Sequence, residues 1–290
     1  MAEIPSVRET HPDMSRHPRR AIATETIAIL DRGSYTAPSG RTVSIADRLA
    51  RALAGTRLYR PDDLGLRPQG SPGLATRIEV TGETTLAAAR RLSGSSGAVP
   101  ACLNFASAKN PGGGFLNGAH AQEEGLARSS GLYASLRKAP EFYDFHRAQH
   151  DLLYSDHVIY SPAIPVFRGD DGVLLEEPYD VAFLTSPAPN RGAIRDPAVA
   201  ARIPDVLWQR ATKVLATAHA NGHDRLVLGA WGCGVFGNHP AEVAGVFAEL
   251  LLADGTFAGA FAHVVFAVWD TAAGAPRHAA FERAFTNAIA

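Results

Sequence analysis

Residues 99–125 read VPACLNFASAKNPGGGFLNGAHAQEEG and decide the fold, because they place a glycine-rich loop between a strand and a helix. The first eight residues, 99–106, are nearly all apolar and predict a buried strand. The helix expected after the loop runs from Gln122 to Lys138. Strands that alternate with helices are typical of α/β folds, and ligands bind in such folds beyond the carboxyl ends of the strands.

Two features of this loop carry chemistry. Gly112, Gly113 and Gly114 can adopt positive φ angles, and their amides can turn inward to bind an oxyanion. Glu123 and Glu124 stand in the first turn of the helix, where unpaired amides favour negative charge. A triple glycine alone is more often a flexible loop, and an acidic pair alone usually complements the helix dipole. Their joint placement after a buried strand predicts a ligand site.

Strand and helix patterns alternate along most of the remaining chain. This alternation predicts an α/β fold in which helices cover a mainly parallel or mixed sheet. The expected strands are 77–81, 99–106, 157–161, 181–186, 226–230 and 263–270, and the expected helices are 84–92, 122–138, 198–221, 240–252 and one at the C-terminus.

The first part of the chain departs from this alternation. Residues 20–34 and 43–54 read as helices, with a turn at Tyr35–Gly40 between them. Residues 55–75 are rich in Gly, Pro and Arg and read as a connection. We therefore expect a helical N-terminal accessory region over residues 1–75 and an α/β domain over residues 76–290.

Composition narrows the class of protein. The chain has 290 residues, a formal net charge of −1 and a pI of about 6.8, so it lacks the basic footprint of a nucleic-acid-binding protein. Cys102 and Cys233 form neither a disulfide framework nor a paired metal motif. With no apolar signal segment and no membrane-spanning run, we expect a cytoplasmic protein that contacts neither membrane nor nucleic acid directly. No coiled-coil pattern is evident, and we expect a monomer.

A second glycine-rich loop follows the strand at 226–230. It reads LGAWGCGVFGNHP over residues 228–240 and leads into a helix, a geometry that presents backbone N–H groups to phosphate. Its glycines match the GxGxxG pattern of dinucleotide-binding folds, but that fingerprint normally belongs to an early βαβ unit. The late position in the chain disfavours a nicotinamide-dependent dehydrogenase.

Together these residues resemble a known family. The glycines 112–114, the loop 115–121 and the triplet Gln122-Glu123-Glu124 look like the signature of poly(ADP-ribose) glycohydrolases of the bacterial type. The preceding LNFASA at 103–108 fits the same branch, and the resemblance extends over nearly the whole chain. It implies a macrodomain-like three-layer α/β/α fold with a mixed central sheet. It also implies a glycosidase that hydrolyses ribose–ribose O-glycosidic bonds in poly(ADP-ribose) and releases ADP-ribose.

The resemblance implies roles in the first loop. It makes Glu124 the catalytic carboxylate, and it gives Glu123 the task of holding a ribose hydroxyl. We expect Asn110 to contact the distal ribose beside the glycines 112–114. Gln122 belongs to the same substrate site, where a structural role is favoured over a chemical one.

The second loop would bind the rest of ADP-ribose. By resemblance to the diphosphate loop of macrodomains, the diphosphate would be wrapped by the residues around Gly232, namely Gly234, Val235, Phe236 and Gly237, and Phe236 would also pack on the distal ribose. A tight turn with Phe236 in the core is the structural alternative. Trp269, at the end of strand 263–270, would stack on adenine, although tryptophan is also a common core residue.

Hydrolysis of a ribose–ribose bond passes through an oxocarbenium-like transition state. Glu124 can protonate the leaving oxygen and then activate water, and the like charge of a bound diphosphate would favour its protonated form. The diphosphate can also stabilise the cation, which makes a second protein nucleophile unnecessary. Two alternatives stay open. One is hydrolysis of another ADP-ribose linkage, such as mono-ADP-ribose on protein or nucleic acid, and the other is ADP-ribose binding without catalysis.

We expect no cofactor and no metal. The HxxxH pairs His146/His150 and His219/His223 lack the glutamate of HExxH and a third ligand, and we interpret them as surface histidines of helices. Cys233 fits its glycine loop because it is small, and we do not expect it to be a nucleophile. The expected partners are poly(ADP-ribose), ADP-ribose and ADP-ribosylated proteins.

Overall fold

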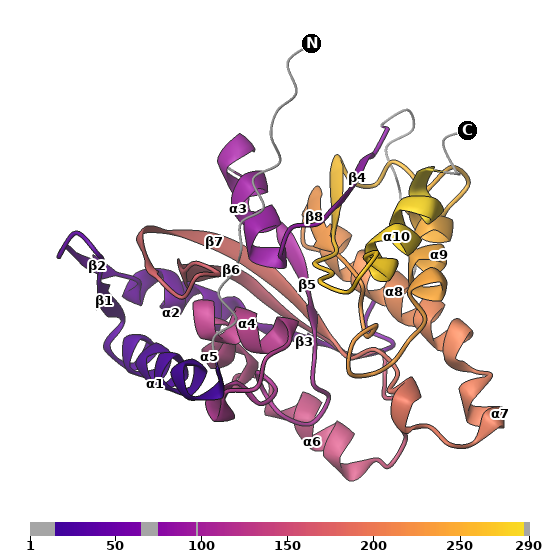
Figure 1. Cartoon of the computed structure of the whole chain (residues 1–290), viewed down its shortest axis with the longest axis horizontal. Coiled ribbons are helices and arrows are strands. Elements are labelled where there is room, and N and C mark those ends of the chain that lie inside the picture. The colour runs from indigo at the N-terminus through magenta and orange to yellow at the C-terminus, as the bar shows by residue number, and fades with distance from the viewer. Residues whose placement is uncertain (1–14, 65–74, 97, 287–290) are drawn as a thin grey trace.

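The computed structural model describes residues 15–64, 75–96 and 98–286, and a seven-stranded mixed sheet forms its centre (Figure 1). The strand order is β3-β6-β7-β5-β8-β9-β4. These strands are β3 (Arg57–Tyr59), β4 (Arg77–Thr81), β5 (Ala101–Phe105), β6 (Val158–Arg168), β7 (Leu174–Ser186), β8 (Arg225–Leu228) and β9 (His263–Ala267). The strands from β7 to β4 run parallel to one another, whereas β6 pairs antiparallel with β3 and β7. The mixed sheet predicted from the sequence is confirmed.

Successive residues of the central strands face two separate cores. Leu103 of β5 packs with α8 (Ile203–Ala220), α9 (Pro240–Leu251) and α10 (Pro276–Thr286) on one face of the sheet. Cys102, one residue earlier, packs on the other face with α3 (Thr85–Ser96), α4 (Gln122–Ser129), α5 (Leu132–Leu136) and α6 (Pro140–Ala148). Burial of each large apolar side chain contributes roughly 1.5–3 kcal/mol relative to exposure. Helices on both faces make the predicted three-layer α/β/α architecture.

The helix predicted over 122–138 is interrupted. It divides into α4 and α5 at Ser130, whose backbone is extended and bridges to Val166 of β6. The Ser130 hydroxyl donates to the Leu126 carbonyl at 2.7 Å and accepts from the Leu132 amide at 3.2 Å, which ends one helix and starts the next.

Three further expectations about secondary structure need correction. The helix predicted over 198–221 is α7 (Pro197–Ala200) followed by α8. The sequence reading missed α6, although it begins with a proline at its first turn. The short strands predicted at 157–161 and 181–186 are parts of the longer pair β6 and β7.

The N-terminal region contains strands as well as the predicted helices α1 (Arg16–Arg32) and α2 (Ala46–Gly55). The turn predicted at Tyr35–Gly40 closes a hairpin of β1 (Ser34–Thr36) and β2 (Thr42–Ser44). Part of the predicted connection forms β3, whose Tyr59 pairs with Val158, and residues 65–74 of it lie outside the described residues. Because β3 belongs to the central sheet, the N-terminal region shares that sheet with the rest of the chain. A domain division at residue 75 stays a prediction.

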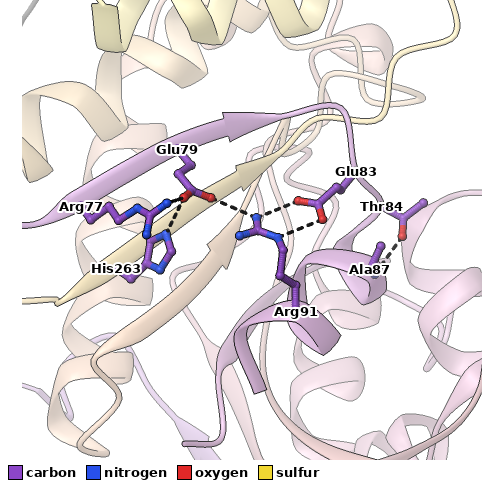
Figure 2. Close-up of polar contacts among 7 residues, drawn as sticks. All are labelled: Arg77, Glu79, Glu83, Thr84, Ala87, Arg91 and His263. Atoms are coloured by element: carbon purple, nitrogen blue, oxygen red, sulfur yellow. Dashed lines mark hydrogen bonds and ion pairs between the residues drawn. The ribbon is translucent and has the colours of Figure 1, made fainter. Parts of the chain in front are cut away.

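Charged side chains fix the edge strand β4 to its neighbours (Figure 2). Glu79 of β4 accepts from Arg91 of α3 at 3.0 Å and lies 3.4 Å from the His263 imidazole of β9. Arg91 also binds Glu83 through two N–H groups at 3.1 and 2.8 Å. Burial raises the pKa of Glu79, but the charges of Arg91, His263 and Arg77 outweigh it and leave that pKa below its usual value. This network keeps the sheet edge aligned with α3.

Within the described ranges, none of the helices combines the length and the apolar character needed to cross a membrane.

Candidate active site

The ends of three adjacent parallel strands bring the predicted site segments together. The loop with the three glycines follows β5, the loop 229–239 follows its neighbour β8, and Trp269 follows β9, the next strand of the sheet. A Cβ on Gly229 would lie 2.6 Å from the Ala267 carbonyl and 3.2 Å from the Phe105 ring, so the three strand ends touch at this glycine. The location agrees with the rule that ligands bind beyond the carboxyl ends of parallel strands.

The glycine loop and the acidic pair fit against each other. Gly112 and Gly113 have φ angles of 69° and 60°, in the left-handed region that favours glycine. A Cβ on Gly113 would collide with Oε1 of Glu124 and would lie 3.2 Å from Oε2 of Glu123. Only a glycine leaves room for both carboxyl groups at this position.

Glu124 is half-buried at the first turn of α4. Its Oε1 accepts a hydrogen bond from the Gly114 amide at 2.9 Å. The carboxyl group is thus oriented by the glycine loop and remains partly accessible.

Glu123 occupies a different environment, although it is the next residue. Its side chain is 3% exposed, and its two oxygens accept from the Ser107 amide at 2.6 Å and from Nδ2 of Asn104 at 3.2 Å. Burial above all, together with the charge of Glu124, raises its pKa to about 8, although the hydrogen bonds from Ser107, Asn104 and Gly112 oppose this shift. The side chain is therefore held rigidly and carries a proton far more readily than an ordinary carboxyl group.

Gln122 ties α4 to the strand before the loop. Its Nε2 donates to the Leu103 carbonyl at 2.8 Å and to the Thr85 hydroxyl at 3.1 Å, and its Oε1 accepts from the Phe105 amide at 2.8 Å. These contacts are those of the structural partner that the sequence favoured. Asn110 is exposed at the start of the glycine turn, where its carbonyl accepts from the Gly113 amide at 3.0 Å. Its contact with a ribose stays a prediction.

The second loop is a tight turn that exposes its backbone. Gly232, at the start of the turn, has a φ of 70°. Its carbonyl accepts two hydrogen bonds from Asn238 at the end of the turn, one from the backbone amide at 3.0 Å and one from Nδ2 at 3.2 Å. A Cβ on Gly234 would meet no atom within 4 Å, and the Val235 side chain is 87% exposed. The turn thus presents an open stretch of backbone beyond the end of β8, the strand next to β5.

Phe236 packs on the inner side of this turn. Its ring centroid lies 6.0 Å from that of Tyr154, and its carbonyl accepts from the Gly192 amide at 2.9 Å. Phe236 is only partly buried, so one side of the ring remains at the surface. Gly237, with a φ of 68°, then reverses the chain toward α9. The binding roles of Gly232, Gly234, Val235, Phe236 and Gly237 stay predictions.

Trp269 lies directly beyond β9 and is 46% exposed. It is not a core residue, and an indole that is partly exposed can stack on a ligand. The neighbouring Asp270 accepts from the Arg277 amide at 2.7 Å and the Ala272 amide at 3.2 Å, which holds the backbone after β9 in a turn. Adenine stacking on Trp269 stays a prediction.

Sequence reasoning missed three residues that support the site. Asn104, buried in β5, holds Glu123 and also donates to Thr185 at 3.2 Å. Tyr154, which backs Phe236, has a φ of 59°, a strained value for a side chain of this size. Arg128 is 5% exposed and donates to the Ala119 carbonyl at 2.7 Å. A polar residue within an apolar strand is a usable signal for Asn104, whereas nothing in the sequence marks the other two.

The interpretation of His146 as a surface residue is wrong. The side chain is 1% exposed, and its ring nitrogens bond the Phe142 carbonyl and the Ser155 hydroxyl, each at 2.7 Å. Ser155 also bonds His157 at 2.8 Å, so these residues stabilise the segment that carries Tyr154.

Among the residues that the structure describes, no three His, Cys, Asp or Glu side chains are grouped as metal ligands. Burial raises the pKa of Cys233 to about 12, which keeps that thiol protonated and non-nucleophilic.

Comparison with known proteins identifies the family. The family model of the microbial-type PARG catalytic domain matches residues 23–169, a segment that starts in α1 and ends just beyond β6. The structure of poly(ADP-ribose) glycohydrolase (PARG) from Thermomonospora curvata is 69% identical, with a TM-score of 0.89, and the match covers 93% of this chain and 100% of that one.

Two ligand complexes are also similar. The Thermomonospora curvata enzyme bound to the inhibitor ADP-HPD is 70% identical, with 92% and 99% of the two chains covered and a TM-score of 0.88. The enzyme from Deinococcus radiodurans in complex with ADP-ribose is 47% identical, with 82% and 97% covered and a TM-score of 0.76. None of the curated proteins compared with the chain matches it significantly. Family model and solved structures agree, and the chain belongs to the microbial-type PARG family of glycosidases.

Proposed function

We propose that this chain hydrolyses the ribose–ribose O-glycosidic bonds of poly(ADP-ribose) and releases ADP-ribose, with Glu124 as general acid and then general base. The observation that carries the proposal is the placement of the Glu124 carboxyl group, held by the Gly114 amide against a glycine turn with no room for a Cβ. The likeness to enzymes solved with ADP-ribose and with the inhibitor ADP-HPD supports the choice of ligand.

The two glutamates suit different tasks. Glu124 is half-buried and can reach both the leaving oxygen of the scissile bond and a water molecule. Glu123 is almost fully buried and its oxygens are engaged by Ser107 and Asn104, so it suits the fixed orientation of one ribose hydroxyl. In this proposal the substrate is fixed by Glu123 and Asn110, and the proton is moved by Glu124.

The turn after β8 supplies the diphosphate site of the proposal. Its backbone is open at Gly234, and the partly exposed Phe236 ring lies beside it. Backbone amides that are already oriented stabilise negative charge without reorganisation during the reaction. The diphosphate held there would stabilise the positive charge of the oxocarbenium-like transition state, so a second carboxylate nucleophile is not required.

The proposal extends to the setting of the reaction. The polymer would be presented on ADP-ribosylated proteins, and we place the enzyme in the cytoplasm as a monomer that uses neither a metal nor a cofactor. The free thiols of Cys102 and Cys233 support a reducing compartment.

The test is incubation of the purified protein with poly(ADP-ribose), scored as released ADP-ribose, for wild type and Glu124→Gln. Glu141→Gln is the matched control, because Glu141 is an exposed acidic residue in the first turn of another helix, α6. Release by wild type and the control, with none by Glu124→Gln although it still binds ADP-ribose, is the expected result. Binding without release by any variant would favour an ADP-ribose-binding module or a different ADP-ribose linkage, which mono-ADP-ribosylated protein and nucleic acid substrates would then separate.

A further inference from the structure

Arginine side chains bind the backbone of residues 117–119, which form the tip turn of the loop 112–121. We call the loop 112–121 the catalytic loop. Arg16 donates through Nε to the Asn117 carbonyl at 2.9 Å, and Arg19 donates through Nε to the Gly118 carbonyl at 2.9 Å. The next carbonyl, that of Ala119, accepts from Arg128 at 2.7 Å. Successive peptide groups of one turn are thus each bound by a guanidinium group, two from α1 and one from α4.

This tip turn is hydrogen-bonded directly to the residue that orients Glu124. The amides of Asn117 and Ala119 both donate to the Gly114 carbonyl, at 3.0 and 3.1 Å. The Gly114 amide in turn donates to Oε1 of Glu124 at 2.9 Å. A shift of the tip turn would therefore move Gly114 and, with it, the proposed acid–base group.

The first helix packs closely against the same loop. A Cβ on Gly118 would collide with the Arg16 carbonyl, so the backbones of α1 and the tip turn are in direct contact. Ala23 of α1 packs with Phe115 of the loop and Ala127 of α4 in one small buried cluster. The Thr26 hydroxyl donates to the Arg128 carbonyl at 2.6 Å. Figure 1 shows α1 alongside this part of the molecule.

The charges in the first turn of α1 are unfavourable for the helix itself. Arg16 and Arg19 stand at its positive end, and the turn contains no acidic residue. Burial and the nearby charge of Arg19 together lower the pKa of Arg128 to about 10, although the charge of Glu124 opposes both effects. This arrangement is disfavoured by local electrostatics, and the hydrogen bonds to the loop offset that cost.

We propose that Arg16 and Arg19 are positioning residues for Glu124. They hold the tip turn of the catalytic loop so that the Gly114 amide keeps the carboxyl group in a reactive orientation. The inference rests on the proposed function and assigns a catalytic task to the N-terminal helix. A displacement of about 1 Å in a catalytic group can reduce turnover about 100-fold, so loss of this support should appear in kcat.

The experiment compares Arg16→Ala/Arg19→Ala with Arg32→Ala, a change of the same kind in the last turn of α1. We expect the double variant to lose about 10-fold or more in kcat, with KM and the Kd for ADP-ribose within about 2-fold of wild type. Arg32→Ala should match wild type. The double variant Arg16→Lys/Arg19→Lys should recover part of the lost kcat, because an ammonium group can still donate to a carbonyl.

Hydrogen exchange of residues 112–121 gives a readout that does not depend on turnover. Faster exchange of this segment in Arg16→Ala/Arg19→Ala, with an unchanged Tm, supports positioning even if wild type proves inactive on poly(ADP-ribose), which would refute the proposed function alone. The inference is overturned if exchange and kcat both equal those of wild type. It is also overturned if kcat falls only in proportion to a lower Tm and the lysine variant restores nothing.

Discussion

Oε1 of Glu124 accepts a hydrogen bond from the backbone amide of Gly114 across the catalytic loop, at 2.9 Å. The geometry of the reaction therefore depends on a peptide group and on the space that glycine leaves around it.

Replacement of Gly113 by alanine should lower turnover strongly. The new Cβ would collide with the Glu124 carboxyl group, and a φ of 60° strains any residue with a side chain. Strain of this kind costs on the order of 1–3 kcal/mol, and the displaced carboxyl group should lower kcat about 100-fold. Gly40→Ala is the control, because Gly40 also has positive φ but no atom within 4 Å of its Cβ position. Equal losses in both variants would contradict the prediction.

Glu123 should make the protein less stable as the pH rises. Its folded-state pKa is raised to about 8, above its unfolded value, so the folded state binds an extra proton between the two values. The associated stability is fully present below the unfolded pKa and is lost as the pH rises through the folded pKa. We expect the Tm of wild type to fall between about pH 5 and pH 8 more steeply than that of Glu123→Gln.

The folded protein can accommodate the glutamine of Glu123→Gln. The Oδ1 atom of Asn104 is buried without a hydrogen-bond partner, so a flipped Asn104 amide can accept from the new Nε2 group. Thermal unfolding of wild type and Glu123→Gln across this pH range tests the prediction. Parallel curves of Tm against pH would show that Glu123 does not titrate with a raised pKa. Because Glu123 is also proposed to hold a ribose hydroxyl, the variant should raise KM.

Loss of the Phe236 ring should weaken binding of ADP-ribose. The ring is partly exposed and braced by Tyr154, so it offers a fixed apolar surface. We expect Phe236→Ala to raise the Kd about 10-fold, in line with about 1.4 kcal/mol for one aromatic contact. Val173→Ala, an exposed apolar position near the β6–β7 turn, should leave the Kd unchanged in calorimetry. A Kd for Phe236→Ala equal to that of wild type would place the ring outside the binding site.

Trp269 should report on the bound base. Since its indole is 46% exposed at the end of β9, stacking on adenine should change its fluorescence. The response to ADP-ribose should disappear in Trp269→Phe and persist in Trp208→Phe, because Trp208 lies on α8 and donates to Glu249 of α9. A response that persists in Trp269→Phe and disappears in Trp208→Phe would assign the signal to α8 and contradict the stacking of adenine on Trp269.

The mixed α/β architecture could be predicted from local patterns, because strands such as β5 and β8 are mostly buried and apolar. What the sequence could not show depends on distant partners. Nothing local distinguishes Ser130 from a helical serine until its backbone bridges to Val166. β3 is a short strand with an exposed arginine, and only its pairing with β6 defines it.

The same limit applies to the site. Gly112–Gly114 and the acidic pair Glu123 and Glu124 lie close together in sequence, and their residue types marked them as a candidate site. The contacts of Arg16 and Arg19 join residues 101 and 99 positions apart, and no local pattern reports such a distance. The positive φ of Tyr154 likewise cannot be predicted from the residue types of the sequence. Sequence reasoning thus found the groups proposed to react and missed the groups that hold them.

The strands β3 and β4 follow each other along the chain but form opposite edges of the sheet. Each strand pairs with a strand that is synthesised much later, since Tyr59 pairs with Val158 and Arg77 pairs with His263. Contacts of such long range slow folding. On the ribosome, β3 and β4 would emerge well before the strands with which they pair. The sheet can therefore acquire the pair of β4 with β9 only after residues 263–267 have been synthesised.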